Sequence, residues 1–294
     1  MSARTRVSNG ENSTAVTSRA SNSTNVNTLF VIGLPRSGTT LLAHMLAGGD
    51  GVLSLSEPFL SLSARRHRLL NWLYFPTIRK SRIVPPRNCD EIGFLNYLKD
   101  FSGALGFSFL IIKETYRQKP CLENTGMINL MAATGVPVIA ITRHPYDIAA
   151  STLSFFRQLR GVKGRLTQMI VSGFHIFSDD REVVEWLSNN WLSFTYWCKQ
   201  NRPLVVRYED LVRDPLPRLQ EICSRCDIPF SREMLNNKRP RFYSGMSGDP
   251  GGLEKHKENL FVRPVGNRNL LKSEFTEIIK SACNEAAEEA GYTL

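Results

Sequence analysis

Residues 29–42 read Leu-Phe-Val-Ile-Gly-Leu-Pro-Arg-Ser-Gly-Thr-Thr-Leu-Leu, and this stretch decides the fold. It opens with a short apolar run, which predicts a buried strand of a parallel sheet. Gly33 and Gly38 bracket a turn, and the apolar spacing after the turn predicts a helix that extends to about residue 47. Such a strand, turn and helix start direct several backbone N–H groups and the helix dipole at one point. The stretch therefore predicts an anion site, and the usual anion is a phosphate.

The residues inside this turn indicate which phosphate it holds. A nucleoside triphosphatase loop reads G-x-x-x-x-G-K-[ST], with its Lys on the β- and γ-phosphates and its hydroxyl on Mg²⁺. Here Thr39 stands at the Lys position, and the positive charge lies inside the turn at Arg36. An Arg can hold a terminal monophosphate through two parallel hydrogen bonds. The loop therefore favours a 5′-phosphate without Mg²⁺ over ATP; the alternative is a βα turn with no binding role.

A second apolar strand runs into a helix over residues 138–151, Val-Ile-Ala-Ile-Thr-Arg-His-Pro-Tyr-Asp-Ile-Ala-Ala-Ser. Pro145 suits the first helical position, and Asp147 suits the positive end of the helix dipole. Arg143 ends the strand, and Ser151 follows eight residues later. Taken alone, this pattern fits a second phosphate site as well as it fits an Arg at a strand end with a Ser buried against the sheet.

The two elements together resemble a known family. Residues 33–42 are similar to the 5′-phosphosulfate-binding loop of sulfotransferases that use 3′-phosphoadenosine 5′-phosphosulfate (PAPS), in the Arg form of tyrosylprotein, carbohydrate and bacterial members. Residues 138–151 resemble the family's 3′-phosphate element. The resemblance spans about residues 28–292 and implies a P-loop-like sulfotransferase fold, PAPS as donor, its product PAP, and no required metal. It assigns the donor contacts to Arg36, Ser37, Gly38, Thr39, Thr40, Arg143 and Ser151.

Two residues resemble the family's catalytic groups, and Arg36 completes the catalytic set at the leaving phosphate. Lys113 ends the apolar run 109–113 at the carboxyl edge of the sheet, where α/β active sites lie, as the family's catalytic Lys does. Cytosolic members carry a catalytic His two residues later, where this chain has Thr115. Glu57 instead follows a short strand, as the Glu base of carbohydrate and tyrosylprotein sulfotransferases does. A carboxylate can act as a general base; Glu114 is the alternative base, and an ion pair with a nearby Arg is the alternative role for Glu57.

The C-terminal third adds two further matches. Residues 205–215, which contain Tyr-Glu-Asp-Leu, resemble a family segment in which Tyr208 packs near the adenine. Arg263 lies in a basic, glycine-bearing stretch that the family keeps over the 3′-phosphate. Leu41 stands where cytosolic enzymes carry the Trp that stacks on adenine, so the resemblance implies a different platform for the base.

Strands and helices are predicted to alternate after residue 28, which indicates an α/β fold with a central parallel sheet flanked by helices on both sides. Asp179 and Glu182 have the spacing of a helix capping box. The predicted strands cover residues 29–32, 52–54, 107–113, 138–142 and 204–208. The predicted later helices cover residues 180–200, 215–226 and 273–290.

Composition predicts one domain over residues 28–294, preceded by a disordered tail over residues 1–27. That tail is rich in Ser, Asn and Thr and poor in large apolar residues, so it cannot bury enough surface to order itself. No apolar run reaches the roughly 20 residues that span a bilayer, and no signal peptide is evident. Six Cys without a dense framework suit thiols kept reduced. Together these features predict a cytoplasmic protein.

The net charge of +10 suits a polyanionic donor. Seven Lys or Arg and no acid lie between residues 65 and 87, interleaved with aromatic and Leu residues. This segment suggests an anionic or amphiphilic hydroxyl acceptor, such as an acidic sugar or a glycolipid, or contact with a membrane surface. Two other functions are weighed against sulfation. A nucleotide kinase would need Lys at position 39, and only the net charge supports a nucleic-acid-binding module.

Overall fold

The computed structural model describes residues 26–58, 90–116, 130–131, 133–158, 176–236, 243–245 and 267–294. The first 25 residues of the predicted tail lie outside this part of the chain. Val26 is buried, and Asn27 already begins the first strand. No helix in the described ranges combines the length and the apolarity that crossing a bilayer requires.

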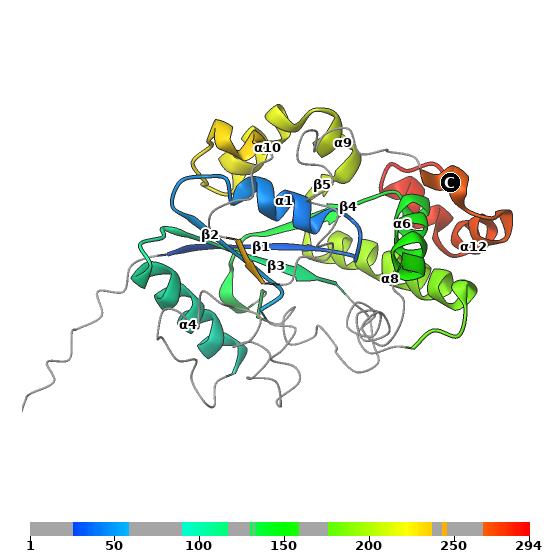
Figure 1. Ribbon diagram of the computed structural model, residues 1–294, viewed down its shortest axis with the longest axis horizontal. Coiled ribbons are helices and arrows are strands. Elements are labelled where there is room, and N and C mark those ends of the chain that lie inside the picture. Colours follow the sequence, from blue (N-terminus) through cyan, green and yellow to red (C-terminus); the bar gives the residue numbers. More distant parts are fainter. Residues whose placement is uncertain are drawn as a thin grey trace, which may run out of the picture.

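A sheet of six parallel strands forms the centre of the described structure (Figure 1). Its spatial order is β5-β4-β1-β3-β2-β6, so β1 lies in the middle with β4 and β3 beside it. The strands are β1 (Asn27–Gly33), β2 (Val52–Ser56), β3 (Phe109–Thr115), β4 (Val138–Thr142), β5 (Leu204–Arg207) and β6 (Tyr243–Gly245).

Helices cover both faces of this sheet, because the strands bury apolar side chains on both sides. One apolar layer packs under α1 (Thr39–Leu46), α9 (Tyr208–Arg213) and α10 (Pro215–Arg225). The other packs against α4 (Glu91–Ala104), α6 (Pro145–Gln158), α8 (Asp180–Asn201) and α12 (Ser273–Glu289). Two short 3₁₀ turns, η2 (Arg232–Leu235) and η3 (Asn267–Leu270), complete the described elements.

The connections after β1 and β4 leave the sheet on opposite faces. β1 leads into α1 on one face, whereas its neighbour β4 leads into α6 on the other. Ligands of open α/β sheets bind at such a switch point, outside the carboxyl ends of the strands. The topology therefore indicates a ligand site at the carboxyl ends of β1 and β4.

The predicted α/β class, with a parallel sheet flanked by helices, is confirmed. The Asp179 half of the capping box is confirmed, because the Asp179 carboxylate accepts a hydrogen bond from the Glu182 N–H at 2.9 Å, whereas the Glu182 carboxylate accepts from the Ser178 N–H at 2.7 Å. Several strand boundaries were wrong, since β1 runs from Asn27 to Gly33, β2 ends at Ser56 and β3 begins at Phe109. β3 extends beyond Lys113 to Thr115, since it stays paired with β1 to that point. Tyr208 begins α9 and does not end β5.

Candidate functional site

The turn after β1 is shaped by its two glycines. A Cβ on Gly33 would lie 2.6 Å from the carbonyl oxygen of Ile141 on β4, so the close approach of the two strands requires glycine. Gly38 has φ 103°, and a Cβ there would lie 2.4 Å from Cδ2 of Tyr208. The Ser37 hydroxyl donates to the carbonyl of Leu34 at 2.8 Å and so closes the turn. The predicted strand, turn and helix start are therefore present.

Arg36 and Ser151 meet although they are far apart in the sequence. Arg36 Nε donates to Ser151 Oγ on α6 at 3.2 Å. The guanidinium of Arg36 also lies over the ring of Phe155, with Cζ 4.9 Å from the ring centroid. The two predicted phosphate-binding elements thus contact each other through side chains that were predicted to bind the donor.

Arg143 ties the same two elements together through the backbone. Its Nη1 donates to the carbonyl of Arg36 at 3.0 Å. Its guanidinium lies over the Tyr208 ring, 4.3 Å from the centroid, and its own carbonyl accepts a hydrogen bond from Trp191 Nε1 at 3.0 Å. Nε of Arg143 is buried without a hydrogen-bond partner in the described structure, so part of this guanidinium has unused donor capacity.

Tyr208 lies behind these cations. Its side chain is buried, against Gly38 on one side and under Arg143 on the other. Thr39 is buried at the start of α1, and Thr40 beside it is partly exposed. The structure thus gathers the described donor-site candidates at the tips of β1, β4 and β5. Arg263 lies outside the described residues.

A network that sequence reasoning missed supports the tip of β4. The Glu209 carboxylate accepts from the backbone N–H of His144 at 2.8 Å and from the Tyr292 hydroxyl at 3.2 Å. The His144 ring contacts the carbonyl of Thr293 at 3.1 Å. Burial lowers the pKa of His144 and raises the pKa of Tyr292. Glu209 belongs to the Tyr-Glu-Asp-Leu motif, which was the available signal, but nothing in the spacing indicates its partners.

Glu57, Lys113 and Thr115 form a second buried cluster. Lys113 Nζ donates to Glu57 Oε1 at 2.5 Å, and the Thr115 hydroxyl donates to the same oxygen at 2.7 Å. The side chains of Lys113 and Glu57 are only 2% and 7% exposed, so this ion pair is held away from water. Within the described residues, the carboxylate pairs with Lys113. Glu114, the alternative base, is buried, and strand alternation directs it to the opposite face from Lys113.

The basic segment of residues 65–87 lies outside the described residues. In the described ranges, no group of three or more His, Cys, Asp or Glu residues is placed to hold a metal ion. Burial raises the pKa of both Cys223 and Cys226 to about 11, which keeps these thiols protonated and unreactive at neutral pH.

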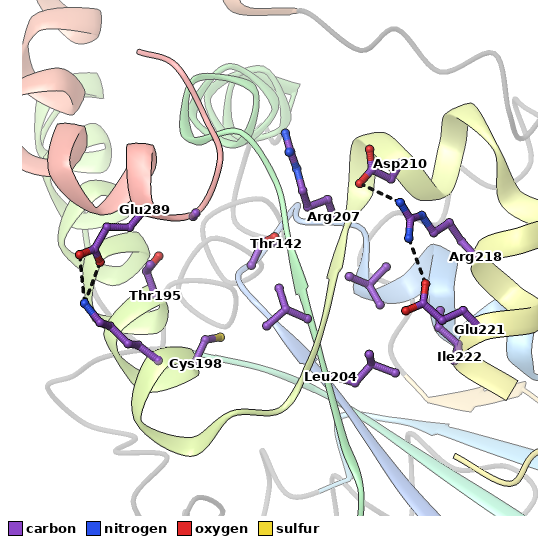
Figure 2. Close-up of a pocket in the computed structure, with 14 residues that line it drawn as sticks. Thr142, Thr195, Cys198, Leu204, Arg207, Asp210, Arg218, Glu221, Ile222 and Glu289 are labelled. Carbon is purple, nitrogen blue, oxygen red and sulfur yellow. Dashed lines mark hydrogen bonds and ion pairs between the residues drawn. The ribbon is translucent and has the colours of Figure 1, made fainter. Parts of the chain in front are cut away.

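Figure 2 shows a cavity of about 660 Å³ beside the edge strand β5. Lys199 and Glu289 form an ion pair at 3.0 Å, as do Arg218 and Glu221, whereas Arg207 lies over the Tyr292 ring. None of the predicted site residues that the structure describes lines this cavity. The candidate site is therefore defined by the strand tips and not by this cavity.

The family follows from a match over most of the chain. The model of the sulfotransferase domain matches residues 27–250. The chain belongs to the sulfotransferase family. As a sulfotransferase, it is an enzyme of sulfuryl transfer. No curated protein matches the sequence.

Solved structures similar to this sulfotransferase are also sulfotransferases. The domain from the curacin biosynthetic pathway is 22% identical, with 92% of this chain and 99% of that chain covered and a TM-score of 0.49. The domain from the Synechococcus PCC 7002 olefin synthase is 20% identical, with coverages of 93% and 98% and a TM-score of 0.47. Mouse sulfotransferase SULT7A1, complexed with PAP, is 16% identical, with coverages of 90% and 85% and a TM-score of 0.47. The family assignment rests on the domain match alone.

Proposed function

We propose that this sulfotransferase transfers a sulfuryl group from PAPS to a hydroxyl of its acceptor. The observation that carries the proposal is the hydrogen bond that joins two Arg residues near the strand tips. Nη1 of Arg143 donates to the backbone carbonyl of Arg36 at 3.0 Å. A donor with phosphates at both its 5′ and 3′ positions needs two cationic sites at a fixed separation. Two Arg residues locked to each other provide such a pair.

In this proposal each end of the donor has its own contacts. The 5′-phosphate lies in the turn after β1, held by Arg36 and by the amides and hydroxyls of residues 37–40. The 3′-phosphate contacts Arg143 and Ser151. Tyr208 supports Arg143 near the adenine, and Arg263 closes over the 3′-phosphate. No metal is required, because these cations and amides carry the charge of the donor.

The reaction proposed is an in-line displacement at sulfur. The acceptor oxygen forms the new O–S bond, while the S–O bond to the 5′-phosphate breaks and its electron pair stays on the phosphate oxygen of PAP. Glu57 takes the proton of the acceptor hydroxyl. Lys113 and Arg36 stabilise the charge on the transferred group and on the leaving phosphate. Catalysis then consists of positioning and charge stabilisation.

For the acceptor, we propose a hydroxyl-bearing molecule that is anionic or amphiphilic, such as a carbohydrate or a glycolipid. The support is the net charge of +10 together with the basic and aromatic segment of residues 65–87. The same features support peripheral membrane contact by a protein located in the cytoplasm. Incubation with labelled PAPS and a panel of glycans, glycolipids, phenols and peptides tests this proposal, and sulfation of neutral phenols alone would contradict it.

Binding of the product nucleotide is the first test of the donor. We expect PAP to raise the melting temperature of the full chain, and ATP with Mg²⁺ to raise it less. Arg143→Ala should remove most of the PAP effect. Arg157→Ala is the matched control, because Arg157 lies on α6 with its side chain 57% exposed and pairs with Asp180 at the surface. Stabilisation by ATP with Mg²⁺ alone would contradict the proposal and favour a nucleotide kinase.

A further inference from the structure

Thr115 lies where β3 presents two polar side chains to one face of the sheet. Side chains alternate along a strand, so Lys113 and Thr115 share a face. Both residues are buried, at 2% and 3% exposure. β2 pairs with β3 in a register that places Ser56 beside Lys113. Alternation alone would direct Glu57, the next residue after β2, to the opposite face, but its positive φ of 57° turns the chain and its carboxylate contacts Lys113.

One carboxylate oxygen of Glu57 accepts both hydrogen bonds of this cluster. Lys113 Nζ lies 2.5 Å from Oε1, Thr115 Oγ1 lies 2.7 Å from it, and Lys113 Nζ lies 3.5 Å from Thr115 Oγ1. An ammonium can only donate, and an ionised carboxylate can only accept. The Thr115 hydroxyl must then donate to Glu57, and it accepts from Lys113. The direction of every hydrogen bond in this ring is fixed.

We propose that Thr115 is a positioning residue that holds the Glu57 carboxylate in the orientation and the ionised form that a general base requires. This inference rests on the proposed sulfuryl transfer with Glu57 as base. The Glu57 backbone is already fixed, because its N–H donates to the carbonyl of Lys113 at 2.6 Å. The hydroxyl of a β-branched residue on a strand has few rotamers, whereas a Lys ammonium on its flexible stem follows the carboxylate. Thr115 therefore fixes the orientation of the Glu57 carboxylate, which Lys113 cannot do.

Thr115 acts through Glu57 and not on the substrate. When the acceptor oxygen attacks sulfur, its proton moves to Glu57, and the electron pair of the broken S–O bond moves to the 5′-phosphate. Thr115 keeps its own proton throughout. Before the step, its hydrogen bond favours the charged form of the carboxylate. Loss of this bond is expected to affect both the orientation of Glu57 and the pH at which it ionises.

The primary test follows the ionisation of Glu57 by NMR. The full chain is labelled with ¹³C at the Glu carboxyl carbons, and the Glu57 signal is assigned through bonds to its backbone. In Thr115→Val we expect the Glu57 titration midpoint about one pH unit higher than in the wild type, since a donor to the charged form is lost. Thr115→Ser should keep the wild-type midpoint. Thr28→Val is the control, because Thr28 is a buried threonine of β1 whose hydroxyl bonds only the carbonyl of Val26 in the described structure.

The second test follows turnover with water as the probe acceptor, by the conversion of PAPS to PAP. Thr115→Val should lower this rate roughly ten- to hundredfold, because a misplaced base loses near-attack geometry. The acid limb of its pH–rate profile should move to higher pH, whereas the Kd for PAP should stay unchanged. If Thr115→Val does not fold, Thr115→Ala removes the same donor and takes its place beside Thr115→Ser.

The possible outcomes separate this inference from the proposed function. An unchanged Glu57 midpoint in Thr115→Val would overturn the inference. So would a Thr115→Ser variant as impaired as Thr115→Val, since the methyl group and not the hydroxyl would then matter. A wild-type chain that binds no PAP would instead overturn the proposed function, whatever Glu57 does.

Discussion

Arg36 and Glu57 share a backbone conformation that residues with side chains rarely adopt. Their φ values are 67° and 57°, in the left-handed region that favours glycine. Such a conformation costs on the order of 1–3 kcal/mol and persists only where the surrounding structure enforces it. At Glu57 the hydrogen bond to the Lys113 carbonyl and the buried ion pair do so. The chain therefore gives up stability at the two residues to which we assign the leaving phosphate and the base.

Glu57→Gln tests the energetic role of the buried pair. The amide keeps the shape of the side chain but leaves the Lys113 ammonium without a carboxylate, so we expect the free energy of unfolding to fall by about 3 kcal/mol. Adding Lys113→Met should recover most of this loss. Urea denaturation measures both variants, and turnover should be absent from both.

The exposed pair between Lys199 and Glu289 provides the control. Its side chains are 63% and 45% exposed, so Glu289→Gln should change the free energy of unfolding by less than about 1 kcal/mol. If the double variant Glu57→Gln with Lys113→Met is as unstable as Glu57→Gln alone, the unpaired charge is not the cause of the loss.

At the scale of elements, the start of α1 and the start of α9 fit together through Gly38 and Tyr208. The Tyr208 ring fills the space that a side chain at position 38 would need, and it carries the Arg143 guanidinium on its other side. This packing adds a second connection between the turn after β1 and the tip of β4, beside the hydrogen bond from Arg143 to the Arg36 carbonyl. The spacing of the two proposed donor subsites therefore depends on how α9 docks.

Gly38→Ala is predicted to disrupt this packing. The new Cβ would meet the Tyr208 ring at 2.4 Å, and φ 103° would be strained for Ala, so we expect a loss of about 2–4 kcal/mol and weaker PAP binding. Gly106→Ala is a matched control, since Gly106 also has positive φ, 86°, but has no atom within 4 Å of the new Cβ. Differential scanning calorimetry compares the two, and equal losses would mean that backbone strain alone acts.

Whether an element can be predicted from the sequence depends on whether neighbouring residues encode it. The strand, turn and helix of residues 29–46 are encoded by consecutive residues, so apolar spacing and two glycines predict them. α4 was not predicted, although Asp90 caps it by accepting from the Gly93 N–H at 2.8 Å. β6 has only three residues, which is too short to show the alternation of apolar and polar residues that predicts a strand.

The site shows the same limit. Arg36, Lys113 and Arg143 could be predicted to lie near the carboxyl ends of their strands, because parallel strands bring these ends to one edge. The bond from Thr115 to Glu57 joins residues 58 apart, and it depends on the register between β2 and β3. Spacing along the chain gives no information about that register, so the hydrogen bond between Thr115 and Glu57 could be found only from the structure.

At the scale of the whole molecule, the residues after α12 complete the support of the proposed donor site. Tyr292 and Thr293 follow α12 and contact Glu209 and His144, which lie beside Arg143. His144 is buried at 5% exposure, and burial is the largest cause of its lowered pKa. The nearby charges of Asp147 and Glu209 raise the pKa of His144, whereas the charge of Arg268 lowers it further.

This lowered pKa predicts how stability depends on pH. The unfolded chain protonates His144 near its ordinary pKa of 6.5, whereas the folded chain resists the proton to lower pH. The contribution of His144 to stability is therefore fully present above about pH 6.5 and is lost as the pH falls below it. Melting temperatures between pH 5 and 8 should decline less on the acid side in His144→Gln than in the wild type. Parallel curves would show that His144 does not titrate on unfolding.

The contact between Tyr292 and Glu209 has a consequence for the order of assembly during synthesis. These residues are 83 apart, and the hydroxyl of Tyr292 also meets that of Thr142, 150 positions earlier. Contacts of such long range form late, because the intervening loop must close first. While the ribosome is still making α12, the tip of β4 lacks this brace, so a nascent chain should gain its affinity for nucleotide only after Tyr292 has emerged.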